Sequence, residues 1–377
     1  MRPVYITRLS KFLPNEPVAN EEMEGILGMV SERSSKAQAI VLRNNGIKTR
    51  YYAFRDGKST HTNAQLAAFA VQQLFDEKLP IEKLQVLSAA TATPDQLLPS
   101  HASMVHGIIG DHPMEITSAT GSCCSGLQAM KYAFMAVRSG SADMVVSCSS
   151  EKVSNWMNAS RFQAEADNLD LLTENPIIAF EKDFLRFMLS DGAGAALLQN
   201  SPNNDGISLA IEWIEIRSYA NELAPCMYAG AIKNEDNTLT GWNDMNVSDW
   251  AEQSIFSIKQ DTRLLANHII AKGGAYLNEL KEKYQLSPDK IDYFLPHLSS
   301  EYFKKEMIAC QKKIGMEIPE EKWFYNLGKV GNIGSASSYV MLEELFYSGR
   351  LKKGDHILVM VPESSRFIYA YMYLTVV

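Results

Sequence analysis

The chain has 377 residues, of which 46% are hydrophobic and 21% are charged, and its formal net charge is −8. This length is more than one ordinary hydrophobic core needs, so we expect two domains or one large duplicated domain, and the composition excludes a disordered chain. The negative charge argues against a nucleic-acid partner, which needs a basic face.

Short apolar segments bounded by turn residues predict buried strands. In chain order they cover residues 83–91, 114–120, 142–150, 194–199, 291–296 and 356–362. Amphipathic patterns between them predict helices over residues 63–75, 125–138 and 335–347. Strands that alternate with helices predict an α/β fold in which helices cover buried sheets.

The segment 199–206, QNSPNNDG, is the clearest linker by composition, and it divides the chain into residues 1–200 and 201–377. Both halves contain a strand, a small-residue turn, a helix, a Ser-Gly pair, an Asp and a second strand. Gly121 and Gly331 stand 18 and 17 residues before Ser139 and Ser348. We interpret this as a duplicated unit that packs as a pseudo-symmetric pair. The alternative is that any two α/β units share this general pattern.

Two regions, 153–187 and 213–262, have weaker periodicity and are expected to be insertions that cover a binding cavity. The five cysteines, Cys123, Cys124, Cys148, Cys226 and Cys310, form neither a disulfide framework nor a CxxC metal pair. We therefore expect no metal and a reduced, cytoplasmic compartment. The chain has no signal-peptide pattern at its start and no apolar run near the ~18 residues of a membrane span.

Cys124 is the first candidate for chemistry, because it stands where a predicted strand meets a predicted helix. The positive end of a helix dipole lowers the pKa of a thiol and favours the nucleophilic thiolate. Free N–H groups of the first turn can also bind an oxyanion. A small buried core cysteine is the alternative interpretation. Cys123 is expected to end the strand and face elsewhere.

His297 and Asn332 are the other two candidates. His297 follows a predicted strand, where α/β proteins place ligands, and its imidazole can donate a hydrogen bond or exchange a proton. Asn332 lies in the turn of the second repeat, equivalent to the turn of Cys124, and its amide can donate to a carbonyl oxygen. Each alone is typical of an ordinary loop residue. A thiol, an imidazole and an amide together suit acyl transfer and enolate stabilisation.

Seven segments in order carry a resemblance to a known family. They are FLPNEPVANEE (12–22), NNGIKTRYYA (44–53), LLPSHAS (97–103), CSGLQAM (124–130), RFMLSDGAGAALL (186–198), LPHLSS (295–300) and GNIGSAS (331–337). The chain resembles the type III β-ketoacyl-acyl-carrier-protein synthases of the thiolase superfamily. The resemblance implies a duplicated, five-layered αβαβα fold, a homodimer, an acylated Cys124, and His297 and Asn332 as partners that stabilise a thioester enolate.

The same resemblance implies further roles. The backbone N–H of Cys124 would form half of the oxyanion hole, and the other half would come from Ser365 in the C-terminal segment. The substrates would be acyl thioesters on the phosphopantetheine of an acyl carrier protein or on coenzyme A, with no other cofactor. Because carrier proteins are acidic, docking needs a basic patch, for which the candidates are Arg138, Lys131, Lys304 and Lys305, although charged helix faces are usually just solvated.

Several positions depart from the family pattern. A run of glycines is replaced by Glu363-Ser364-Ser365-Arg366 before Phe367, so Arg366 and Phe367 are expected beside the substrate pocket. Residues that grip the adenine of coenzyme A are replaced near Ile40 and Asn44, which favours a carrier-bound donor. A phenylalanine that closes the neighbouring subunit's acyl pocket is replaced by Leu98, which predicts a longer or differently shaped pocket.

These departures favour a specialised synthase similar to the ketosynthases that form dialkylresorcinols by joining β-ketoacyl and acyl units. Two alternatives stay open. One is a starter synthase of fatty acid synthesis that uses acyl-CoA and malonyl carrier protein. The other is a non-catalytic partner subunit of a heterodimeric ketosynthase.

Overall fold

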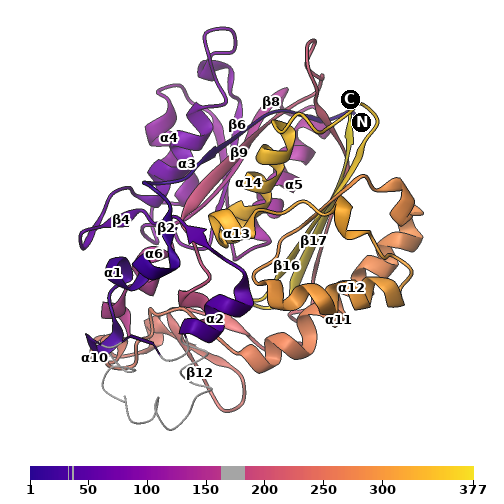
Figure 1. The fold of residues 1–377 in the computed structure, drawn as a ribbon. Coiled ribbons are helices and arrows are strands. Elements are labelled where there is room, and N and C mark those ends of the chain that lie inside the picture. Colours follow the sequence, from indigo (N-terminus) through magenta and orange to yellow (C-terminus); the bar gives the residue numbers. More distant parts are fainter. Residues whose placement is uncertain (33, 36–37, 163–182) are drawn as a thin grey trace.

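A computed structural model describes the chain except residues 33, 36–37 and 163–182. Among the described residues, a nine-stranded sheet has the order β15-β16-β17-β10-β1-β9-β8-β6-β7 (Figure 1). These strands are β1 Tyr5–Phe12, β6 Val86–Thr91, β7 Glu115–Thr120, β8 Met144–Glu151, β9 Gly192–Gln199, β10 Leu209–Ser218, β15 Tyr293–Pro296, β16 His356–Glu363 and β17 Ile368–Val376.

The sheet consists of two similar halves. In the first, β7, β6 and β8 are parallel, and β9 is antiparallel to both β8 and β1. In the second, β15 and β16 are parallel, and β17 is antiparallel to both β16 and β10. Among the strands of this sheet in the described residues, the two halves are hydrogen-bonded where β1 meets β10, at the pairs Tyr5–Ala210 and Ile6–Leu209. The repeated strand pattern supports the interpretation that the chain contains a duplicated unit.

Helices form the other layers. The helices α3 (Asn63–Gln72) and α4 (His101–Ile109) cover the first half, and α11 (Thr262–Tyr284) and α12 (Lys304–Lys313) cover the second (Figure 1). Between the halves, α5 (Ser125–Ser139) and α14 (Ser337–Phe346) approach closely. A Cβ on Gly126 would lie 2.2 Å from the Ser335 carbonyl oxygen. The layers therefore alternate in the αβαβα order of the thiolase fold.

Shorter elements decorate this frame. The helices are α1 Met23–Leu27, α2 Gln38–Asn45, α6 Ser154–Met157, α10 Val247–Glu252 and α13 Leu327–Val330. The strands are β2 Val18–Ala19, β3 Thr49–Arg50, β4 Phe54–Arg55, β5 Lys58–Ser59, β11 Met227–Tyr228, β12 Ala231–Lys233, β13 Leu239–Gly241 and β14 Lys259–Gln260. No helix in the described part of the chain combines the length and the apolar character that crossing a membrane requires.

The predicted strands and helices are all found, with two corrections. The segment 114–120 was expected to be buried, but β7 is the last strand of the sheet and three of its six residues are exposed. The region 213–262 was expected to be an insertion, but its first residues, up to Ser218, belong to the central strand β10. The part of the other insertion that spans 163–182 lies outside the described residues.

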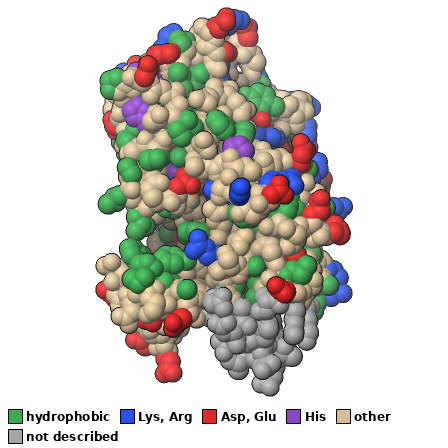
Figure 2. All heavy atoms as spheres, turned by 90° about the vertical axis from the view of Figure 1, so that its left-hand side faces the viewer, with side chains coloured by type: hydrophobic (Ala, Val, Ile, Leu, Met, Phe, Trp, Pro, Cys, Tyr) green, Lys and Arg blue, Asp and Glu red, His purple; other side chains and the backbone are tan. Residues whose placement is uncertain are grey.

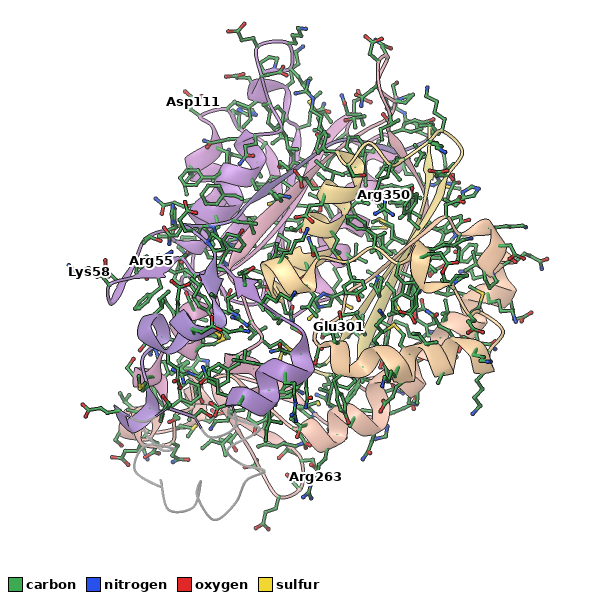
Figure 3. The ribbon with its side chains drawn as sticks, viewed as in Figure 1. Arg55, Lys58, Asp111, Arg263, Glu301 and Arg350 are labelled. Atoms are coloured by element: carbon green, nitrogen blue, oxygen red, sulfur yellow. The ribbon has the colours of Figure 1, made fainter. Side chains whose placement is uncertain are left out.

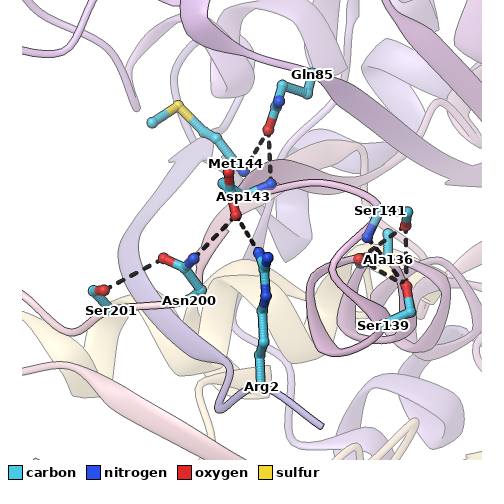
Figure 4. Close-up of polar contacts among 9 residues, drawn as sticks. All are labelled: Arg2, Gln85, Ala136, Ser139, Ser141, Asp143, Met144, Asn200 and Ser201. Carbon is cyan, nitrogen blue, oxygen red and sulfur yellow. Dashed lines mark hydrogen bonds and ion pairs between the residues drawn. The ribbon is translucent and has the colours of Figure 1, made fainter.

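The Ser-Gly pairs end both helices of the repeat. Gly140 and Gly349 have φ values of 84° and 72°, which glycine adopts without a Cβ clash. The Asp that follows the first pair, Asp143, accepts hydrogen bonds from Arg2 and Asn200, and its backbone N–H donates to Gln85 at 2.7 Å (Figure 4). These contacts tie the start of the chain and the end of β9 to the beginning of β8.

Candidate active site

A cavity of about 270 Å³ lies at the carboxyl ends of strands from both halves. Its polar rim comes from the turn after β7, from the end of β8, from the loop after β15, from the turn before α14 and from the turn after β16. The residues on this rim include Ser122, Cys123, Glu151, His297, Asn332, Ser364 and Ser365. Apolar side chains from both predicted insertions complete the wall, among them Trp156, Leu185, Met227 and Ile258.

The two adjacent cysteines face in different directions. Cys123 lines the cavity and is half-buried. Cys124 is fully buried, its sulfur lies 3.1 Å from the Val361 carbonyl oxygen and 3.4 Å from that of Ile368, and it does not line the cavity. The expectation that Cys124 presents its thiol to the site is therefore wrong, and so is the expectation that Cys123 faces elsewhere.

The local backbone explains this orientation. The N–H and hydroxyl of Ser125 both reach the Ser122 carbonyl oxygen, at 2.9 and 2.8 Å, so the chain turns at Ser122–Cys124 before α5 begins. Cys124 directly precedes the helix and packs in the core between α5 and the sheet, together with Leu127 and Val361. Cys123, one residue earlier in the turn, is left on the cavity side.

Burial raises the pKa of the Cys123 thiol, and the nearby carboxyl groups of Glu363 and Glu151 raise it further. The pKa of the Cys124 thiol is also raised by burial and by Glu363. This is the opposite of the lowering expected at a helix N-terminus. Desolvation and negative charge outweigh the helix dipole here, so the thiol form is favoured.

His297 reaches the cavity from the loop after β15, where its backbone N–H is held by the Met360 carbonyl oxygen at 2.7 Å. Burial lowers the pKa of its imidazole to about 4, so the ring is neutral near pH 7. Its Nε2 atom is buried and has no hydrogen-bond partner in the part of the chain that the structure describes. A buried polar atom of this kind is satisfied when a ligand oxygen binds.

Asn332 is fixed by its backbone and by its own side chain. Its carbonyl oxygen accepts from Ser190 N–H at 2.8 Å, and its N–H donates to the Met188 carbonyl oxygen at 3.1 Å. Its Oδ1 accepts from Gly334 N–H at 2.9 Å. The amide is thereby oriented, with its Nδ2 group as the donor end. The structure thus brings His297 and Asn332 to one cavity, with Cys123 in place of Cys124.

One expected donor of the oxyanion hole, the Cys124 N–H, is bonded to a carboxyl group. The N–H of Cys124 donates to Glu363 Oε2 at 3.2 Å. The hydroxyl of Ser365 donates to Glu363 Oε1 at 2.5 Å, and the hydroxyl of Ser122 donates to Ser365 Oγ at 2.9 Å. Ser365 lies beside the cysteines as expected, but Glu363 holds the donor that was assigned to the substrate.

The three expected pocket residues lie outside this cavity. Phe367 is fully buried and faces His268, because its φ of 57° turns the ring into the core. Arg366 is exposed and contacts the Leu223 carbonyl oxygen. The expectation that these two line the pocket is therefore wrong. Leu98 is 85% exposed, and its expected role in a neighbouring subunit stays a prediction.

The four docking candidates have different surroundings. Lys131 and Arg138 lie along α5, which places Arg138 about 20 Å from Cys123 at 1.5 Å per residue. Lys304 forms an ion pair with Glu320 at 2.8 Å, and its Nζ donates a hydrogen bond to the Tyr325 hydroxyl at 3.1 Å. Lys305 is exposed.

Sequence reasoning missed Cys123, Glu151 and Glu363 as site residues. Glu151 ends β8, lines the cavity and accepts from Thr93 Oγ1 at 2.7 Å and from Ala92 N–H at 3.0 Å. The available signal was the placement of acidic residues at the carboxyl ends of two Val-rich strands. In the described part of the chain, no group of three or more His, Cys, Asp or Glu residues could hold a metal ion.

Comparisons with known proteins agree with this architecture. Residues 60–203 match the family described as "Beta-ketoacyl synthase, N-terminal domain", and residues 281–361 match "3-Oxoacyl-[acyl-carrier-protein (ACP)] synthase III C terminal". The β-ketoacyl-[acyl-carrier-protein] synthase III of Chlorobaculum tepidum is 22% identical over 94% of both chains. That of Clostridioides difficile is 24% identical over 94% of this chain and 93% of its own.

Solved structures show the same fold. The tetronic acid condensing enzyme AbyA1 has a TM-score of 0.76 at 20% identity, and each chain is covered to 99%. Xanthomonas campestris OleA with bound lauric acid and lauroyl-CoA has a TM-score of 0.75 at 19% identity and the same coverage. This chain belongs to the thiolase superfamily. Within it, the chain is a type III ketosynthase, an acyl-transferring condensing enzyme.

Proposed function

We propose that this ketosynthase accepts an acyl group on Cys123 and joins it, by Claisen-type carbon–carbon bond formation, to a carrier-bound β-ketoacyl or malonyl-type thioester. The observation that carries the proposal is the meeting of Cys123, His297 and Asn332 in one largely apolar cavity. We assign this activity to specialised lipid or polyketide biosynthesis of the dialkylresorcinol type.

The chemistry follows from the donors in the cavity. The Cys123 sulfur attacks the thioester carbonyl, and the pantetheine thiol leaves with the proton of the cysteine. The second thioester then forms an enolate, either by releasing CO2 or by giving an α-proton to water. Its α-carbon attacks the acyl carbon, the bond from that carbon to sulfur breaks, and Cys123 leaves as a thiolate that takes up a proton. Neutral His297 and the Asn332 amide are suited to donate hydrogen bonds to the enolate oxygen, where charge develops.

A second cavity of about 220 Å³ supports delivery by a pantetheine arm. It shares Phe184 and Leu265 with the first cavity, and its other lining residues are Val41, Asn44, Asn45, Thr262, Ala266, Ser300, Tyr302 and Phe303. The arm of an acyl carrier protein or of coenzyme A would pass this way, and no other cofactor is proposed.

Three exposed cations stand one or two residues from residues that line the second cavity. Arg43 lies on α2, Arg263 follows the lining residue Thr262, and Lys305 is two residues from Phe303. Arg263 points away from the body of the molecule (Figure 3). These residues suit an acidic carrier protein. Lys305 was already a candidate, and Arg43 and Arg263 replace Lys131 and Arg138 in the proposal.

Intact mass after incubation with an acyl carrier thioester tests the assignment of the nucleophile. We expect one acyl adduct in the wild type and in Cys124→Ala, and none in Cys123→Ala. An adduct that persists in Cys123→Ala and disappears in Cys124→Ala would contradict the proposal. Turnover by the purified chain alone would exclude the non-catalytic partner subunit, which the retained cavity residues disfavour.

The starter synthase is the second candidate, because the curated relatives are named β-ketoacyl-[acyl-carrier-protein] synthase III. The same mass measurement separates the two, with acetyl-CoA and a medium-chain acyl carrier protein as competing donors. We expect the longer, carrier-bound donor to acylate faster. Rapid acylation from acetyl-CoA would favour the starter reaction.

We also propose a homodimer that forms along the edge strand β7. This edge is exposed, and next to it α4 and the preceding loop expose Leu97, Leu98, Met104 and Ile108. Figure 2 looks onto the side of the molecule where α4 lies in Figure 1, and hydrophobic side chains gather there in several clusters. A bare strand edge beside apolar side chains favours pairing with a second copy.

A further inference from the structure

Glu363 is a buried carboxyl group behind the cavity wall, between the lining residues Pro362 and Ser364, and it has no role in the reaction described above. It is the last residue of β16 and is 2% exposed. It begins the turn where the chain departs from the glycine run of the family it resembles. A carboxyl group at this depth is costly unless donors compensate its charge.

The donors are all on the turns that build the site. Cys124 N–H reaches Oε2 at 3.2 Å, and the Ser365 hydroxyl reaches Oε1 at 2.5 Å. The N-terminus of the 15-residue helix α5 adds the positive end of its dipole. Among the described residues, no lysine or arginine forms an ion pair with Glu363. Glu363 is therefore held by the backbone donor that the resemblance assigns to the oxyanion hole.

The charge of Glu363 also acts on the nucleophile, since it raises the pKa of the Cys123 thiol. Glu363 also acts on the Cys124 thiol, Glu151 from β8 acts on Cys123, and Tyr369 from β17 interacts with Cys124. His297, from the loop after β15, lines the same cavity as Cys123. Of these, His297 is neutral near pH 7 and Glu151 carries the same sign of charge. None of them offsets the effect of Glu363.

We propose that Glu363 is a positioning residue that occupies the oxyanion donor of Cys124 and keeps Cys123 in its thiol form until a thioester carbonyl displaces it. This inference rests on the proposed function. It makes the resting enzyme poorly reactive toward adventitious electrophiles, and it couples thiol activation to the arrival of the substrate oxygen at Cys124 N–H.

The pH dependence has a definite sign. Burial raises the pKa of Glu363, so the group becomes neutral as the pH falls through that value. Below it, Glu363 no longer opposes thiolate formation, and removing its charge changes nothing. Above this pH, the ionised Glu363 suppresses the Cys123 thiolate, so a variant without the charge should contain more thiolate than the wild type.

Alkylation of Cys123 by iodoacetamide, followed across pH by fragment-resolved mass spectrometry, tests the inference without any substrate. In Glu363→Gln, which keeps an acceptor for Cys124 N–H but loses the charge, we expect about tenfold faster alkylation on the alkaline side, as for a thiol pKa lower by about one unit. The two profiles should converge at low pH. Glu279→Gln, at an exposed ion pair with Arg217, is the control and should follow the wild type.

Parallel profiles for the wild type and a folded Glu363→Gln would overturn the inference. Should that variant fail to fold, Ser365→Ala serves instead, because it removes the hydroxyl that stabilises the carboxylate and raises the pKa of Glu363. Cys123 in this variant should then be alkylated faster than in the wild type only between the two pKa values of Glu363, that of the wild type and the higher one of the variant. An unchanged profile would again overturn the inference. Failure of acylation with a normal alkylation shift would contradict the proposed function alone.

Discussion

Burial determines the charge state of the side chains that line the cavity. His297 has a pKa of about 4, and the pKa values of Cys123, Glu151 and Glu363 are all raised, each chiefly by desolvation. Burial therefore opposes charge on each of these groups, and His297 is neutral near pH 7. Neutral donors suit an enolate oxygen, because a charged imidazolium would first have to be desolvated.

A stability measurement tests the state of His297. Its pKa is about 4 in the folded chain and 6.5 without burial, so the unfolded chain binds the proton more readily. The free energy of unfolding carries no penalty from His297 above pH 6.5. As the pH falls from 6.5 toward 4, proton uptake by the unfolded chain lowers the free energy of unfolding by roughly 3 kcal/mol. We expect denaturant unfolding of His297→Gln between pH 7.5 and 4.5 to show a smaller loss of stability than the wild type.

His101, another buried histidine with a pKa of about 4, remains in that variant and preserves part of the dependence. Equal losses of unfolding free energy in the wild type and in His297→Gln would show that His297 does not titrate as the structure indicates.

The sequence places a cysteine pair at the junction of a strand and a helix, but it does not show which thiol faces the site. One residue along a tight turn reverses the direction of a side chain, and that choice depends on core packing against Val361 and Ile368, far away in the sequence. The same holds for Glu363, because its role depends on a hydrogen bond from Cys124 N–H that joins residues far apart in the sequence. Residue types were predictable here, and side-chain directions were not.

At the scale of elements, much more was predictable. Strands such as 142–150 and 356–362 and helices such as 125–138 have strong local patterns, and the structure contains all of them within a few residues. The exposure of β7 was not predictable, because strand order in a sheet is set by long-range pairing. Strand β10 was not predicted from the sequence, because polar and apolar residues are mixed along it without a clear strand pattern.

The contact between α5 and the turn before α14 is the element-scale feature on which the site depends. A Cβ on Gly126 would lie 2.2 Å from the Ser335 carbonyl oxygen, and this backbone atom cannot rotate away. We expect Gly126→Ala to lower the free energy of unfolding by about 3 kcal/mol or more, as overpacking does in a dense interface. Because Asn332 precedes this turn, acylation or condensation should fall as well.

Gly107→Ala is the matched control, since this glycine lies in α4, is exposed, and has no atom within 4 Å of the added Cβ. It should stabilise the protein by about 0.5–1 kcal/mol through helix propensity. Similar unfolding midpoints for the two variants in chemical denaturation would show that the close approach of α5 is not what restricts residue 126.

At the scale of the whole molecule, the two halves of the chain contribute different parts of one cavity. Cys123 and Glu151 come from the first half, and His297, Asn332 and Ser365 come from the second. The site therefore exists only when the halves are packed together around α5 and α14. The edge of the sheet at β7 is then left as the surface where a second molecule can add strands without disturbing the cavity.

Sedimentation equilibrium tests this last step. We expect the wild type to be dimeric at micromolar concentration, and the Leu98→Asp variant to dissociate more readily. Leu98 is 85% exposed in the single chain, and burying a leucine contributes about 1.5–3 kcal/mol. A symmetric dimer loses two copies of Leu98, so association should weaken by roughly a hundred- to ten-thousandfold. Val247→Asp, at a residue that is 71% exposed on α10, should leave association unchanged.

The acyl adduct provides a second measurement on the same variants. If Leu98 also closes the neighbouring subunit's acyl pocket, Leu98→Asp should slow acylation by long chains more than by short ones, even at concentrations where the dimer persists. A wild type that stays monomeric would contradict the homodimer. A dimer that Leu98→Asp does not weaken would place the interface away from β7 and α4, because a buried aspartate beside Leu97 could not be accommodated without cost.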